Sequence, residues 1–360
     1  TILCDEKPMS KKTTTMVWYS AVPLWLLIRF ARTYPQETEQ YYSRYFYPLV
    51  FNLRQLLLDW IPLSLGDILY IVLSGYLLRT VTKKLPYWKV KPINILLDIG
   101  SFAILTAWVF HLSWGFNYHR LPLNEQLNIS IKYSKQDLEN GIDQLIRKSN
   151  HLHHQLVTSD TLAVTFPFSK DQVLEKIKPY DPLLQKIILN ATQVKKSLLS
   201  LPLSYMGYAG YLNPFTLESQ VNAKIPLLSL ITTSFHEMAH QLGYASEKEA
   251  NFIAYLSAIN SDDPYLQYAG YTFAFRYFYS ELYKLDSEKA VRKLKMLHPG
   301  ILKNFKTVSD FWKQYKNPFE IVFDKAYDGY LKANGQTSGI KSYNEMVGLV
   351  INHHKNQGVF

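Results

Sequence analysis

The stretch SFHEMAHQLGYASEKEANF, residues 234–252, places two histidines four positions apart with a glutamate between them. On an α-helix this spacing puts His236 and His240 on one face, one turn apart, with Glu237 beside them. The apolar run PLLSLITTSF before the motif suits a buried helix, and Gly243 three residues after His240 suits its end. The pattern therefore indicates a helical site able to hold one metal ion.

A third protein ligand is needed, because a catalytic zinc ion usually takes three and leaves one position for water. Ser246 occupies the place of the last histidine in an HExxHxxGxxH site, and a serine hydroxyl is a poor zinc ligand. Ser246 and Glu249 have capping-box spacing, which gives Glu249 a structural role and leaves Glu247 free to bind metal. If the second helix runs antiparallel to the first, Glu247 approaches His240, and Asn251 approaches and orients the other histidine. Glu249 remains the alternative ligand.

HEMAH followed by Glu247 and Asn251 resembles the gluzincin arrangement, HExxH with a downstream ExxxD, found in thermolysin-like and membrane-embedded CAAX-type zinc peptidases. The resemblance implies that His236, His240 and Glu247 bind one Zn²⁺ ion and that Glu237 is the general base. Two features depart from the family: only six residues separate the two motifs, and Asn251 stands in place of the aspartate. The alternative interpretation is that Glu247 and Glu249 bind no metal and only interact favourably with the dipole at the start of the second helix.

Composition restricts the class of protein and the kind of metal site. A chain of 360 residues with 48% hydrophobic and 15% aromatic content can bury a large core. Cys4 is the only cysteine, so a metal must be bound by histidine and carboxylate. The net charge of +10 is scattered, without a basic block interleaved with aromatics or a glycine-rich phosphate loop. We therefore expect no nucleic-acid partner.

Three apolar runs in the first third of the chain have about the length that a bilayer requires. They occupy residues 16–31, 61–78 and 93–114. Arg29, Asp67 and Asp98 interrupt the runs near their ends, where an interfacial position lowers the cost of a charge. The runs predict three transmembrane helices in contact with membrane lipid, and the alternative is three buried helices of a soluble core.

Basic residues before the first run and in the segment 79–91 place both segments in the cytoplasm by the positive-inside tendency. We therefore expect a multi-pass protein of the bacterial cytoplasmic membrane. Its parts would be a polar leader (1–15), a membrane region (16–114) and an extracytoplasmic domain (115–360). The expected fold of that domain is zincin-like, mainly α with a small β element.

Two segments of the C-terminal part carry further candidate residues. The segment 134–156 begins with a capping signature at Ser134 and ends with three histidines, which we expect to be solvated because they lack a carboxylate partner in register. The segment 205–224, with its glycines and Asn-Pro step, predicts a turn between two short strands. It offers an edge strand for an extended peptide, or a hairpin that only covers the core. The histidines are His151, His153 and His154, and the candidate substrate contacts are Asn213, Glu218 and Asn222.

A wider resemblance covers most of the chain. The three apolar runs combine with WGFNYHR (114–120), NPFTLESQVN (213–222), HQLGYASEKEANF (240–252) and YLKANGQTSGIKSYNEMV (330–347). This combination resembles an uncharacterised bacterial family of membrane-anchored HExxH proteins, known as a domain of unknown function. The resemblance implies a fold and a location, and it supplies no substrate.

The sequence as a whole predicts a membrane-anchored zinc metallopeptidase that hydrolyses peptide bonds of a peptide or protein substrate. Glu237 would be the general base toward a zinc-activated water, and Tyr343 would stabilise the oxyanion, with Arg276 and His353 as alternatives. The second function is a membrane-anchored binding or scaffold protein with a catalytically inactive zincin-like domain. A transporter or channel is disfavoured, because the two acids in the apolar runs form no evident relay.

Overall fold

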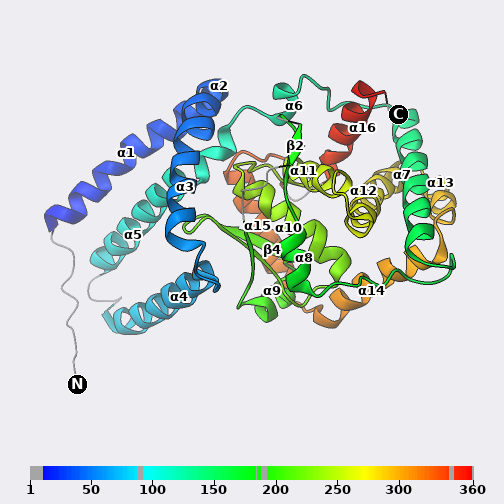
Figure 1. Ribbon diagram of the computed structural model, residues 1–360. Helices are drawn as coiled ribbons and strands as arrows, with labels where there is room; N and C mark the ends of the chain where they lie inside the picture. The colour runs from blue at the N-terminus through cyan, green and yellow to red at the C-terminus, as the bar shows by residue number, and fades with distance from the viewer. Residues whose placement is uncertain (1–10, 88–91, 184, 188–192, 340–343, 359–360) are drawn as a thin grey trace. The chain divides into compact units, whose positions relative to one another are not determined.

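The computed structural model describes residues 11–87, 92–183, 185–187, 193–339 and 344–358, and these are mainly helical with two small sheets (Figure 1). The mainly α fold with a small β element is thus confirmed. The chain divides into two compact units. Unit 1 comprises Thr1–Gln55, Leu65–Arg120 and Pro214–Leu217, and unit 2 comprises Leu56–Ser64, Leu121–Asn213 and Glu218–Phe360.

Unit 1 is built from the helices that carry the apolar runs. They are α1 (Lys11–Thr33), α2 (Pro35–Glu37), the π-helix η1 (Thr38–Phe46), most of α3 (Tyr47–Leu58), α4 (Leu65–Lys84), the 3₁₀-helix η2 (Leu85–Tyr87), α5 (Pro92–Ser113) and the 3₁₀-helix η3 (Gly115–His119). Helix α1 packs against α5, where the Trp18 ring lies so close to Gly100 that a Cβ there would be 2.3 Å from it. The Trp108 indole also donates to the carbonyl of Ser20 (3.2 Å).

Two described helices, not the three predicted, are long and apolar enough to cross a membrane: Leu65–Tyr87 and Pro92–Ser113. The first predicted run lies in α1, where Tyr19, Ser20 and Arg29 dilute the apolar side chains, so that part of the prediction was wrong. Only 11% of the most apolar window of either span is buried, unlike the core helix of a soluble protein. Asp98 of the second span forms an ion pair with Lys84 (2.5 Å).

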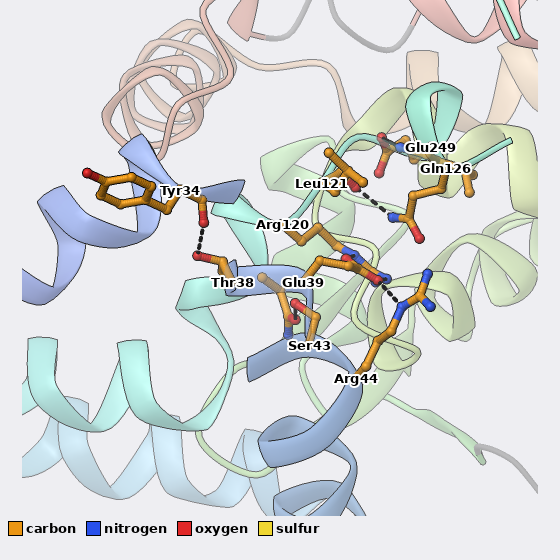
Figure 2. A network of polar contacts seen from close by, with 11 residues as sticks. Tyr34, Thr38, Glu39, Ser43, Arg44, Arg120, Leu121, Gln126 and Glu249 are labelled. Atoms are coloured by element: carbon orange, nitrogen blue, oxygen red, sulfur yellow. Dashed lines mark hydrogen bonds and ion pairs between the residues drawn. The ribbon is translucent and has the colours of Figure 1, made fainter. Parts of the chain in front are cut away.

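A buried carboxylate joins two segments of unit 1 that are distant in sequence. Glu39 of η1 accepts hydrogen bonds from the Arg120 guanidinium at Nε and Nη2 (both 2.8 Å) and from Arg44 Nε (2.9 Å) (Figure 2). Ser43 on the same π-helix donates to Asn117 Oδ1 (2.9 Å). These contacts fix η1 against the segment that follows α5.

Unit 2 is a helical bundle around one hydrophobic core. Its helices are α6 (Leu123–Gln126), α7 (Lys135–Leu156), α8 (Lys170–Lys176), α9 (Ser200–Met206), α10 (Leu227–Gln241), α11 (Glu247–Ile259), α12 (Pro264–Leu285), α13 (Ser287–Leu294), α14 (Pro299–Tyr315), α15 (Glu320–Ala333) and α16 (Met346–Asn356). Helix α7 packs on α12, α12 on α11, and α11 on α10. The capping box predicted at Ser134 is confirmed, with Asp137 as its partner. Phe235, Phe252 and Phe275 are fully buried between these helices.

Short strands complete unit 2. Strands β1 (Tyr180–Asp181) and β2 (Lys186–Ile187) pair antiparallel, and β3 (Val194–Lys196), β5 (Glu218–Val221) and β4 (Gly210–Asn213) form a sheet in that order. Strand β4 runs antiparallel to β5, which confirms the strand pair predicted within 205–224, and β3 runs parallel to β5. Because Asn222 N–H donates to Ala209 O (2.8 Å), the ladder directs the backbone groups of Gly210 and Leu212 to the outer edge of β4.

Candidate metal centre

Three potential metal ligands converge where α10 meets α11. His236 and His240 share one face of α10, with ring centroids 4.6 Å apart and ring planes at 90°. Glu247, the first residue of α11, places its Oε2 3.1 Å from His236 Nε2 and 3.5 Å from His240 Nε2. Two ligand atoms that each bind zinc tetrahedrally at about 2.0–2.1 Å lie about 3.3 Å apart, so the donor set and its spacing fit a zinc ion.

Hydrogen bonds on the far side of each ring determine which nitrogen faces the cluster. His236 Nδ1 lies 2.8 Å from Asn251 Oδ1, and His240 Nδ1 lies 2.7 Å from the backbone oxygen of Tyr244. Both partners are acceptors, so each Nδ1 donates and each Nε2 of the neutral ring carries a lone pair. With both rings neutral, two nitrogen lone pairs and one carboxylate oxygen would therefore point at the same place, an arrangement that either a proton on one ring or a metal ion would stabilise.

The charges of the cluster reflect the same need for a cation. Burial by itself raises the pKa of Glu247, but the nearby imidazoles of His240 and His236 outweigh it and hold that pKa well below its usual range. Burial also lowers the pKa of His240, yet the Glu247 carboxylate outweighs it and raises the pKa to about 9. A proton on His240 thus supplies the positive charge that a metal ion would otherwise supply.

Glu237 is placed to handle protons beside this cluster. It is buried, and its Oε2 has no hydrogen-bond partner among the described residues. Burial raises the pKa of Glu237 to about 7, against the smaller opposing influence of the two histidines. The edge strand β4 passes next to it, since a Cβ on Gly210 would lie 2.8 Å from Glu237 Oε1.

The residues around the ligands are largely ones that the sequence motif does not contain. Tyr327 of α15 donates its hydroxyl to Glu247 Oε1 (2.8 Å), which leaves Oε2 directed at the histidines. Gln336 accepts from the Glu247 N–H (3.3 Å) and donates to the carbonyl of Ala245 (3.1 Å). Asn251 donates to the Tyr277 hydroxyl (3.3 Å), which fixes the amide so that Oδ1 faces His236. No local sequence pattern indicated Tyr327 or Gln336, because they lie 80 and 89 residues away from Glu247 along the chain.

Glu249 lies away from the ligand cluster, and its expected capping role was wrong. Among the residues that the structure describes, the Ser246 side chain makes no capping hydrogen bond at the start of α11. Glu249 Oε1 instead accepts the backbone N–H of Leu123 (2.7 Å), close to the Gln126–Leu121 hydrogen bond (2.6 Å) (Figure 2). Glu249 therefore ties the start of α6 to α11, and Glu247 is the acid that lies with the histidines.

The three side chains predicted to contact substrate are fully buried. Glu218 forms an ion pair with Lys195 (2.7 Å), and Asn222 donates to Ser204 Oγ (2.9 Å) and accepts from Lys224 N–H (2.9 Å). Asn213 is also fully buried, at the end of β4. The packing of the sheet encloses these side chains, which argues against direct contact with a substrate, and the assignment stays a prediction. What this segment offers to a ligand is the outer backbone edge of β4.

The candidate oxyanion donors are not brought to the cluster by any described contact. Tyr343 lies outside the described residues. Arg276 is exposed on α12 and lines a surface pocket with Trp312 and Glu320. The His353 ring packs edge-on against the Phe252 ring, with the ring centroids 5.4 Å apart.

Comparison with known proteins places the chain in a family without adding an activity. Residues 42–351 match the family described as "Protein of unknown function (DUF3810)", and the chain belongs to this family. The predicted resemblance to an uncharacterised family is thereby confirmed. None of the curated proteins and none of the solved structures matches the chain.

Proposed function

We propose that this chain is a membrane-anchored zinc metallopeptidase whose unit 2 is a zincin-like catalytic domain. The observation that carries the proposal is the convergence of His236 Nε2, His240 Nε2 and Glu247 Oε2. These three atoms would hold one Zn²⁺ ion. Beside them lies the buried Oε2 of Glu237, which has no hydrogen-bond partner within the described part of the chain. A bound zinc ion supplies Lewis acidity toward water and toward a substrate carbonyl group.

Glu237 would act as the general base. A carboxyl group with a pKa near 7 can take a proton from water and later release it to the leaving amine, since neither step is far uphill at neutral pH. Burial, which raises this pKa, also leaves Oε2 without a proton donor from any residue that the structure describes. A glutamate on the solvated surface would be too weak a base for this work.

The substrate would be an extended peptide segment. The backbone groups of Gly210 and Leu212 face the outer edge of β4, and Gly210 lies against Glu237. A peptide added to this edge would gain main-chain hydrogen bonds and pass beside the general base. A side chain at position 210 would obstruct that approach, which gives the glycine a steric purpose.

The membrane part of the proposal rests on the two apolar helices of unit 1. Side chains such as Ile71, Leu78 and Leu96 are exposed on them, as expected for surfaces covered by lipid. The basic residues at the end of α4, Lys83 and Lys84, favour the cytoplasm for that end. We accordingly propose the bacterial cytoplasmic membrane, with unit 2 on the extracytoplasmic side.

An inactive scaffold is the second candidate, and one observation favours it. His236 and His240 are only 8% and 6% exposed, and structural zinc sites are closed whereas catalytic sites keep a position open. The two candidates differ in what Glu237 does. Glu237 transfers protons in the enzyme and has no catalytic role in the scaffold.

The test is a comparison of the full-length protein in detergent with its Glu237→Gln variant. Zinc content would be measured by mass spectrometry, and proteolysis by digestion of a peptide library. An enzyme keeps about one zinc at this site in both proteins and loses cleavage at least a hundredfold in the variant. Equal cleavage by both proteins, or none by the wild type in its zinc-loaded form, contradicts the proposal.

A further inference from the structure

A second group of potential metal ligands lies in unit 2, formed by residues outside the HExxH region. His153 belongs to α7, Asp160 to the loop after it, and His298 is the N-cap of α14, a helix that packs against α7 (Figure 1). His153 Nδ1 lies 3.1 Å from His298 Nδ1, which lies 3.3 Å from Asp160 Oδ1. All three atoms are within 4.8 Å of one another. The expectation that His153 is solvated was wrong, since it is fully buried, whereas His151 and His154 are exposed.

The far side of the His153 ring fixes its tautomer. Its Nε2 lies 2.8 Å from the carbonyl oxygen of Leu162, which can only accept, so Nε2 donates and Nδ1 of the neutral ring carries a lone pair. Gly300 makes this arrangement possible. A Cβ there would lie 2.4 Å from His153 Nε2 and 2.0 Å from the Leu162 oxygen, so any larger residue would displace one of them.

The other two ligands are held in place by hydrogen bonds of their own. The backbone N–H of His298 donates to Asn150 Oδ1 (3.0 Å), and Asn150 donates to the carbonyl of Met296 (2.9 Å). The backbone oxygen of Asp160 accepts from Gly300 N–H (2.8 Å). These bonds hold the backbone of both ligand residues in place, so that the His298 and Asp160 side chains start from fixed positions near His153.

We propose that His153 Nδ1, His298 Nδ1 and Asp160 Oδ1 bind a divalent transition-metal ion, independently of the HExxH centre. The ion would be Zn²⁺, because two imidazole nitrogens and one carboxylate oxygen are donors that suit zinc. Zinc ligands at about 2.0–2.1 Å in a tetrahedral site are about 3.3 Å apart, and the two distances of 3.1 and 3.3 Å match this spacing. The ion would be structural. It would link the end of α7 to the start of α14 across 145 residues of chain, and closing so long a loop strongly restricts the unfolded chain.

The competing interpretation is a hydrogen bond in which His298 Nδ1–H is shared between His153 and Asp160, with no metal. Titration of the full-length protein with Co²⁺, followed by its visible absorption, separates the two. A His236→Ala/His240→Ala variant removes the first site. We expect one equivalent of Co²⁺ to bind to this background and two to the wild type.

Adding Asp160→Asn or His298→Asn to the background should weaken Co²⁺ binding at least tenfold, and His151→Asn, an exposed residue at the same helix end, should leave it unchanged. Asp160 is half-exposed, so its variant keeps the core intact, which melting curves in a chelator would verify. If the His236→Ala/His240→Ala variant folds poorly, His298→Asn is made in the wild type instead. That single variant should then bind one equivalent of Co²⁺ where the wild type binds two. A background that binds no Co²⁺, or ligand variants that bind as tightly as the control, would overturn the second site and leave the peptidase proposal untouched.

Discussion

Asn251 Oδ1 lies 2.8 Å from His236 Nδ1, so a residue one turn into α11 determines which nitrogen of a histidine on α10 faces the candidate metal. The gluzincin pattern has an aspartate at this position. The amide performs the same task because its oxygen accepts while its nitrogen is occupied by the Tyr277 hydroxyl. The substitution of asparagine for aspartate thus removes a charge without removing the hydrogen bond.

We predict that Asn251→Ala weakens zinc binding about 10- to 100-fold, because partners of this kind hold the ligand ring and its tautomer. Asn251→Asp should bind zinc at least as tightly as the wild type, since a carboxylate accepts the same proton. Competition with a chromophoric chelator gives both affinities. Equal affinities for the alanine and wild-type proteins would show that His236 needs no such partner.

The Tyr327 hydroxyl should contribute to the same site from α15. Tyr327→Phe removes the donor to Glu247 Oε1 and leaves a buried carboxylate oxygen unpaired, at a cost of about 1–3 kcal/mol. We expect zinc affinity to fall by about 5- to 150-fold, which is the range that this cost corresponds to. Tyr283→Phe, at a half-exposed position on α12, is the matched control and should change nothing. A similar loss in both variants would point to a general effect on the fold.

The sequence predicted those parts of the site that depend on local spacing. The i, i+4 histidines and Glu237 needed only one helix, and the strand pair in 205–224 needed only its turn residues. Contacts between distant segments were not predictable. Glu249 satisfied the spacing of a capping box, but Leu123, 126 residues away, provides its partner. His153 looked solvated for the same reason, because His298 and Leu162 enclose it only after folding.

The buried pair of Lys195 and Glu218 should be important for stability. Lys195 Nζ contacts Glu218 Oε1 (2.7 Å) and the carbonyl of Ile61 (2.7 Å), both within unit 2. Glu218→Ala leaves a buried ammonium without its carboxylate, which costs about 3–5 kcal/mol. Thermal unfolding in detergent should therefore show a clear loss of stability. Unchanged stability together with a raised KM would instead restore the substrate role that burial argues against.

His354 should make the stability of unit 2 depend on pH. Burial lowers its folded-state pKa to about 4, and its Nε2 lies 2.8 Å from the Tyr255 hydroxyl. In the unfolded chain the pKa is about 6.5, so below that pH the unfolded state binds the extra proton. The stability contributed by neutral His354 is thus complete above about pH 6.5 and is lost as the pH falls toward 4.

The matched variant is His354→Gln, which keeps a polar group near Tyr255 and cannot titrate. Wild-type melting temperature should fall between pH 6.5 and 4 more steeply than that of the variant. The exposed His151→Gln variant is the control and should follow the wild-type curve, because its side chain lies on the surface and outside the core that encloses His354. Parallel curves for all three proteins would mean that the buried imidazole is protonated without cost, and that Tyr255 accommodates the charge.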